Sequence, residues 1–259
     1  MPDYTLVCGV DAKHIRQLAW VWPTWKLKKP SLLEHPMIVF YDWKQVKGEE
    51  ITAVVDHPDL SLVPWPPEGV VHDRTTEDKW GDPQRYKMLA GFVYVPAEHV
   101  KTEYWLKLDV DTVATGQDDW IDEKWFENDP AIVAQSWGFT KPPDQMQVLD
   151  KWARTVLYLR CSKSLNLIPK EGSNRLGHKR IISWCGFFNT EFSKECKYYA
   201  LSVGYGYLPV PSQDGFMWFM AKRLGYDIVR TQMKSLGWEH WGTEYNIRQA
   251  VERVLSNGQ

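Results

Sequence analysis

The sequence has few cysteines and almost no net charge. The four cysteines, Cys8, Cys161, Cys185 and Cys196, are widely scattered and form no CxxC pair. This spacing argues against a disulfide framework and against a zinc site. Lys and Arg number 31 and Asp and Glu number 33, which leaves a net charge of -2. Such a balance gives the chain no global attraction to nucleic acid or to an anionic membrane.

The sequence also lacks any long apolar run. No stretch of about 18 consecutive apolar residues occurs, so we expect no transmembrane helix. Met1-Pro2-Asp3-Tyr4 leads directly into an apolar segment, without the basic stretch of a secretory signal. We therefore expect a soluble, cytoplasmic protein.

Aromatic residues are abundant instead, with 15 Trp, 12 Tyr and 9 Phe among 259 residues. Tryptophan offers flat apolar area and one polar N–H, which suits a protein core and also suits stacking against sugar rings. Most such rings are expected in the core. With 44% hydrophobic residues, the chain is suited to one large domain.

Apolar segments alternate between strand-like and helix-like patterns in the first half. Tyr4 to Val10, Pro36 to Tyr41 and Ile51 to Val55 are predicted strands, and the region from Asp59 to Asp82 is a predicted irregular connection. Helical spacing follows Asp11 and stops at Pro23, and it returns over residues 83–93. This alternation favours a parallel sheet with right-handed crossovers.

The second half predicts strands over residues 131–135 and 180–189. Helical patterns are found over residues 146–160, 190–202, 215–224 and 246–255. Residues 161–180 are polar, basic and rich in turn formers, which predicts a mobile surface loop. A basic loop of this kind is either a solvated surface or a lid that covers a phosphate.

The most informative segment is Tyr104 to Ala114, an apolar strand that ends in two carboxylates. Asp109 and Asp111 are two residues apart, so in an extended chain their side chains leave the same face. Adjacent carboxylates repel, and taking them out of water is costly. A divalent cation resolves this, and oxygen ligands suit Mg²⁺ or Mn²⁺. The carboxyl end of a strand in an open α/β sheet is also where ligands bind.

Leu106-Lys107-Leu108-Asp109-Val110-Asp111 resembles the DxD signature of nucleotide-sugar-dependent glycosyltransferases with the GT-A fold. Trp184 to Asn189 resembles the glycine-containing donor segment of such enzymes. Ser212 to Gly215 resembles their acidic motif, with Gln213 where a second acid is often found. The resemblance implies an α/β fold over residues 1–259, a single Rossmann-like domain with a mostly parallel central sheet flanked by helices. Residues 1–111 would form the nucleotide-binding half and residues 112–259 the acceptor half.

The resemblance also implies a metal site. Asp111 would bind Mn²⁺ or Mg²⁺ directly, Asp109 would contact metal-bound water or the donor ribose, and His240 would supply a further ligand. The structural alternatives are a strand-end turn for the two aspartates and core packing for His240, which lies between Trp238 and Trp241.

Donor and acceptor contacts follow from the same resemblance. Asp11, Arg85 and Gly186 would contact the nucleotide-sugar donor, with a UDP-sugar favoured. Asp214 would be the catalytic base of an inverting enzyme, or would support the oxocarbenium-like centre of a retaining one. As structural alternatives, Asp11 and Asp214 would cap helices and Arg85 would lie on a solvated helix face.

The resemblance implies an enzyme, a hexosyltransferase that moves a sugar from a nucleotide diphosphate to an acceptor hydroxyl. A sugar-nucleotide nucleotidyltransferase is an alternative, but such enzymes usually carry a glycine-rich phosphate loop after the first strand. Gly9-Val10-Asp11-Ala12-Lys13 contains only one glycine. A second alternative is a non-catalytic carbohydrate-binding protein that stacks sugars on tryptophan.

Overall fold

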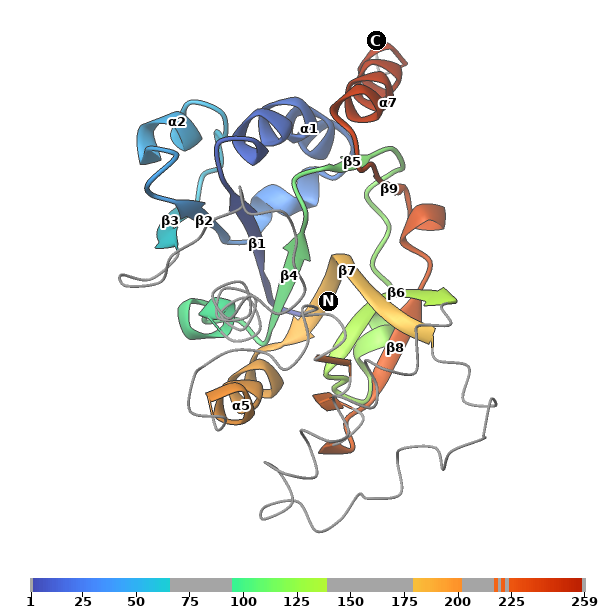
Figure 1. Ribbon diagram of the computed structural model, residues 1–259. Coiled ribbons are helices and arrows are strands. Elements are labelled where there is room, and N and C mark those ends of the chain that lie inside the picture. The colour runs from blue at the N-terminus through green and yellow to red at the C-terminus, as the bar shows by residue number, and fades with distance from the viewer. Residues whose placement is uncertain are drawn as a thin grey trace.

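The computed structural model describes residues 2–65, 95–138, 179–201 and 217–257, apart from 219, 222 and 223. Seven strands form a central sheet in the order β3-β2-β1-β4-β7-β6-β8 (Figure 1). The strands are β1 Tyr4–Val10, β2 Met37–Asp42, β3 Leu60–Trp65, β4 Tyr104–Leu108, β6 Ile132–Gly138, β7 Lys179–Asn189 and β8 Ile228–Thr231.

Most strand pairs in this sheet are parallel. β1 pairs in parallel with β2 and β4, β2 pairs in parallel with β3, and β6 pairs in parallel with β8. β7 is antiparallel to both β4 and β6. The predicted α/β class with a mostly parallel sheet is therefore confirmed. The parallel arrangement places the carboxyl ends of β1 and β4 at the same edge.

Helices lie on both faces of the sheet (Figure 1). The described helices are α1 His14–Lys28, α2 Gly48–Thr52, α5 Thr190–Leu201 and α7 Glu244–Ser256, with short 3-10 turns at η1 Pro30–Glu34, η2 Glu123–Phe126 and η4 Met233–Leu236. Trp22 and Trp25 of α1 join Leu106 and Leu108 of β4 in one buried cluster. Among the described residues, no helix has the length and apolar character needed to cross a bilayer.

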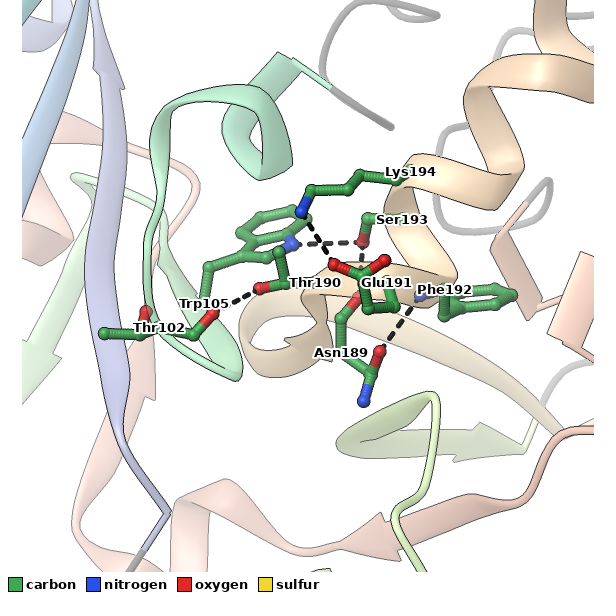
Figure 2. Close-up of polar contacts among 8 residues, drawn as sticks. All are labelled: Thr102, Trp105, Asn189, Thr190, Glu191, Phe192, Ser193 and Lys194. Atoms are coloured by element: carbon green, nitrogen blue, oxygen red, sulfur yellow. Dashed lines mark hydrogen bonds and ion pairs between the residues drawn. The ribbon is translucent and has the colours of Figure 1, made fainter.

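Helix α5 begins directly after β7 and is fixed to β4 by polar contacts (Figure 2). The Asn189 side chain accepts a hydrogen bond from the Phe192 N–H at 2.9 Å, which caps the helix. The indole N–H of Trp105 donates to the Ser193 hydroxyl at 3.0 Å. Because Trp105 and Leu106 leave opposite faces of β4, α5 and α1 cover opposite faces of the sheet.

The third strand lies later than the sequence predicts. Ile51, expected in a strand over residues 51–55, belongs to α2, and β3 begins at Leu60. The Glu50 carboxylate accepts a hydrogen bond from the Lys47 N–H at 2.8 Å, which stabilises the first turn of the helix. A short apolar run does not distinguish a strand from one helical turn. Pro64 is tolerated in β3 because β3 is an edge strand.

Helix α1 continues past Pro23, where the sequence pattern predicts its end, as far as Lys28. Trp22, Thr24 and Trp25 around the proline are all buried. This burial holds the last turn in place although proline removes one helical hydrogen bond. The predicted helices over residues 190–202 and 246–255 match α5 and α7, and those over 83–93 and 146–160 lie outside the described residues.

A buried lysine follows α1. The Lys29 ammonium donates to the carbonyl oxygens of Gln117 and Leu236, at 3.0 Å for the latter. It also lies 5.7 Å and 5.6 Å from the ring centroids of Trp120 and Trp238. Burial lowers its pKa to about 8. Lys29 therefore connects α1 to two segments that lie far apart in the sequence.

We expect Lys29→Met to lower the free energy of unfolding by about 1–3 kcal/mol, because two carbonyl oxygens lose their charged donor. Urea denaturation followed by circular dichroism measures this loss. Lys28→Met is the matched control, since Lys28 is only partly buried and precedes Lys29 by one residue. Equal stability of the two variants would contradict a structural role for the Lys29 ammonium.

Candidate metal centre

The two aspartates lie in the turn that follows β4. The Asp109 N–H donates to the carbonyl oxygen of Trp184 on β7 at 2.8 Å, which continues the β4–β7 pairing by one residue. The Thr112 N–H then donates to the Asp109 carbonyl oxygen at 3.0 Å and closes the turn. The backbone at both ends of the Asp109–Asp111 segment is therefore held by hydrogen bonds.

A small second sheet brings His240 to this turn. It pairs β5 Thr112–Ala114 with β9 Trp238–His240 in antiparallel register, with Thr112 opposite His240. The Trp241 N–H also donates to the Asp111 carbonyl oxygen at 3.1 Å. Backbone pairing therefore places a residue from the C-terminal part of the chain beside the aspartates.

Two glycines allow this sheet to form. Gly237 ends η4 with φ of +81°, a conformation that L side chains rarely adopt. A Cβ atom on Gly116 would lie 2.6 Å from the Gly237 Cα, so the backbones approach too closely for side chains. The Gly237 carbonyl oxygen accepts hydrogen bonds from the N–H groups of Thr115 and Gly116. These bonds extend the β5–β9 pairing beyond Ala114.

Helix α1 supports the same sheet from the core side. The Trp25 indole N–H donates to the Thr112 carbonyl oxygen at 2.7 Å. The Thr24 hydroxyl accepts a hydrogen bond from the Ala114 N–H at 3.3 Å. Both residues of α1 are fully buried. The strand that follows Asp111 is therefore tied to the hydrophobic core.

Asp109, Asp111 and His240 form a compact cluster of three ligand atoms, all within 4.8 Å of one another. Opposite ligands of an octahedral Mg²⁺ lie about 4.2 Å apart, close to this spacing. Two carboxylates and an imidazole form a mixed oxygen and nitrogen set that suits a divalent cation such as Mn²⁺. The side chains are 39%, 22% and 36% exposed, so water and a ligand can reach them.

His240 and Asp111 also form an ion pair, with 3.1 Å between the imidazole Nε2 and the carboxylate Oδ1. Burial is the largest single influence and works against the charged form of each group, but the hydrogen bond and the charge attraction between them together outweigh it. The pKa of His240 is therefore raised and the pKa of Asp111 is lowered. A proton on His240 balances the carboxylate when no cation does so.

Lys107 balances the other aspartate. Its Nζ lies 2.5 Å from the Asp109 Oδ1, and its side chain is only 13% exposed. Lys107 and Asp109 are two residues apart at the end of β4, so their side chains leave the same face. Each carboxylate of the cluster thus has its own cationic partner, Lys107 for Asp109 and His240 for Asp111.

Asp11 lies at the same edge of the sheet but caps α1. Its Oδ1 accepts hydrogen bonds from the N–H groups of Lys13 and His14, at 3.0 Å and 2.9 Å, and pairs with the His14 ring at 2.8 Å. The cap explains why an acid follows β1. The donor contact expected of Asp11 stays a prediction.

Gly186 has a structural reason to be glycine. It lies opposite Lys107 in β4 and opposite Ala134 in β6. A Cβ atom there would approach the Ala134 Cβ to 2.9 Å and the Val133 carbonyl oxygen to 3.2 Å. Close strand packing accounts for this glycine without a donor, and its expected donor contact also stays a prediction.

Arg85, Asp214 and most of the predicted loop over residues 161–180 lie outside the described residues. Of the predicted site residues, the structure brings together Asp109, Asp111 and His240. Sequence reasoning missed Lys107, although a lysine within an otherwise apolar strand is a detectable signal for a buried partner. It also missed Trp184, whose part in the centre has no signal in the local sequence.

Comparisons with solved structures identify the fold. Core-mannan synthase A from Aspergillus fumigatus, in its Mn/GDP form, superposes with a TM-score of 0.59 and 12% identity, over 86% of this chain and 70% of the other. The galactosyltransferase LgtC, in complex with donor and acceptor sugar analogues, gives 0.57 and 10%, over 96% of both chains. The chain has the GT-A fold.

The GT-A fold agrees with the resemblance predicted from the DxD strand. A third structure, 4-diphosphocytidyl-2C-methyl-D-erythritol synthase from Anaerococcus prevotii, gives a TM-score of 0.55 and 9% identity, over 98% of this chain and 99% of the other. No protein-family model and no curated protein sequence matches the chain. Because all three sequence identities are low, the likeness establishes the fold alone. The reaction has to be inferred from the residues of the site.

We expect the affinity of the protein for Mn²⁺ to fall as the pH is lowered through the raised pKa of His240. Below that pKa a cation must displace the imidazole proton, which costs about tenfold in affinity per pH unit. Titrations with MnCl₂ at a series of pH values, read from the electron paramagnetic resonance of free Mn²⁺, measure this. His240→Gln should flatten the profile in this range, and a wild-type profile that is already flat would remove His240 from the metal centre.

Proposed function

We propose that this protein is a metal-dependent glycosyltransferase, which moves a sugar from a nucleotide diphosphate sugar to an acceptor hydroxyl. The observation that carries this proposal is the cluster of Asp109, Asp111 and His240 at the carboxyl end of β4 in a GT-A fold. The ligand atoms come from two distant parts of the chain, which is not expected of a simple strand-end turn.

The chemistry of the leaving group explains the acidic cluster. A nucleoside diphosphate leaves a sugar only if its negative charge is neutralised, and a divalent cation held by Asp111 and His240 would supply that neutralisation. Asp109, paired with Lys107, would face the donor from the other side of the cluster. Lys107 adds a positive charge near the diphosphate, which a purely acidic site would repel.

The donor is proposed to carry guanine. The sequence resemblance favours a UDP-sugar, but core-mannan synthase A is described in a form with Mn and GDP, and this supports a GDP-sugar for the related fold. Arg85, Asp11 and Gly186 are proposed donor contacts on the resemblance alone. The acceptor is proposed to be a carbohydrate hydroxyl.

Nucleotidyl transfer is the second candidate, because a diphosphocytidyl synthase shares the fold. One contact weighs against it. A phosphate-binding loop after β1 would need free backbone N–H groups, whereas those of Lys13 and His14 are bonded to the Asp11 carboxylate. This position is therefore less suited to a triphosphate than a glycine-rich loop would be.

We expect the wild-type protein with Mn²⁺ to release GDP from a GDP-sugar, and Asp111→Asn to abolish this release. Asn keeps the shape of the side chain but removes the charge that binds the cation. A screen of GDP- and UDP-sugars, followed by chromatography of the nucleotide products, makes the measurement. Asp122→Asn is the control, since Asp122 is exposed and caps η2 away from the cluster.

Two outcomes would contradict the proposal when that screen is extended to nucleoside triphosphates with sugar phosphates and to the binding of free sugars. Release of pyrophosphate from a nucleoside triphosphate and a sugar phosphate would establish nucleotidyl transfer instead. Binding of sugars without release of either product would favour a carbohydrate-binding protein. Release of UDP alone would keep the glycosyltransferase and overturn only the choice of guanine.

Asp214 is the proposed catalytic residue on the acceptor side of the reaction, as the base of an inverting enzyme or as a support for the oxocarbenium-like centre of a retaining one. We expect Asp214→Asn to lose turnover while keeping the affinity for the donor, because it does not hold the diphosphate. Calorimetry with GDP and Mn²⁺ measures the affinity, and product release measures the turnover. Near-normal turnover would leave Asp214 with the role of a helix cap.

A further inference from the structure

Trp184 contacts both the turn that carries the two aspartates and the third candidate ligand, His240. Its carbonyl oxygen accepts the Asp109 N–H at 2.8 Å, and the Thr112 hydroxyl lies 3.5 Å from the same oxygen. These contacts involve only the backbone of Trp184. They fix the turn that carries the two aspartates whatever side chain is present.

The indole ring makes a separate contact with the third ligand. Its centroid lies 5.6 Å from that of the His240 imidazole, and the two planes are inclined by only 20°. Trp184 is 6% exposed, whereas the His240 side chain is 36% exposed. A buried, fixed ring therefore packs against one face of a half-exposed ring.

Backbone pairing alone does not orient the imidazole. The β5–β9 register places the Cα of His240 opposite Thr112, but rotation about the last side-chain torsion of histidine is broad. Nε2 points at Asp111 only in one range of ring orientations. The flat contact with Trp184 restricts the plane of the ring, and the contact of Nε2 with Asp111 then selects one of the two ring orientations that share this plane.

We infer that the Trp184 side chain is a positioning residue of the metal centre, which holds the His240 imidazole so that Nε2 faces Asp111. The inference rests on the proposed function, because it assumes that these residues bind a divalent cation. It assigns to the donor segment around Gly186 a task that does not involve the donor. That task is to orient the metal-binding side chain of His240, which comes from another part of the chain.

Four variants test this inference. Trp184→Leu removes the flat ring but keeps an apolar side chain, and Trp184→Phe keeps an aromatic face. His240→Ala and the double variant His240→Ala/Trp184→Leu complete a double-mutant cycle. Trp65→Leu is the matched control: Trp65 is 7% exposed against 6% for Trp184, and it packs edge-to-face on Phe40. It lies on the edge strand β3, and β2, β1 and β4 separate it from β7.

The measurement is the dissociation constant for Mn²⁺ alone, read from the signal of free Mn²⁺, at a temperature where circular dichroism shows every variant folded. We expect Trp184→Leu to weaken binding by about three- to tenfold, the size of effect that loss of an aromatic contact produces. Trp184→Phe should bind within about twofold of the wild type. Trp65→Leu should lower the melting temperature without changing Mn²⁺ affinity.

The cycle separates positioning from general packing. If Trp184 acts through His240, Trp184→Leu has no further effect once His240 is alanine. An equal loss in both backgrounds, or the same loss in Trp65→Leu, would overturn the inference. Wild-type affinity in Trp184→Leu would also overturn it while leaving the metal centre intact. Absence of Mn²⁺ binding by the wild type would instead count against the proposed function.

Discussion

Repulsion between two carboxylates at the end of a buried strand is the constraint on which the other parts of the centre depend. Asp109 and Asp111 cannot both be charged and close together without compensation. The structure supplies one cation to each, Lys107 to Asp109 at 2.5 Å and His240 to Asp111 at 3.1 Å. The two partners differ in kind, because the histidine proton can be exchanged for a metal ion, whereas a lysine ammonium has no lone pair with which to bind one.

The need to bring His240 to this turn accounts for much of the surrounding structure. The β5–β9 pairing and the approach of Gly116 to Gly237 place the C-terminal part of the chain against the strand that follows the aspartates. The hydrogen bond from Trp25 to Thr112 ties that strand to α1. Lys29 adds a further link, from the end of α1 to the carbonyl oxygen of Leu236 in η4. Core packing and site geometry are therefore coupled through α1.

Sequence reasoning succeeded where a pattern is local. The first strand over Tyr4–Val10 and the helices α5 and α7 follow from apolar periodicity, and the DxD pair follows from two acids after an apolar run. It failed over residues 51–55, where five residues fit a strand or a helical turn equally well. Trp184 was missed because strand pairing brings its partners Asp109 and His240 to it, which is a property of the tertiary fold and leaves no mark on neighbouring residues. Lys107 was missed although its partner Asp109 lies only two residues further along the chain.

The charges in the cluster would link the binding of a cation to the binding of a nucleotide. Asp109, Asp111 and His240 would hold a divalent cation, and the oxygens of a diphosphate would be suited to bind the same cation. Asp109 is already paired with Lys107, so its attraction for a cation is reduced. A diphosphate would restore that attraction by bringing negative charge of its own, and its oxygens would lie near the Lys107 ammonium. On the proposed function, the positive charge that would weaken binding of the cation alone would thus favour binding of the cation and the diphosphate together.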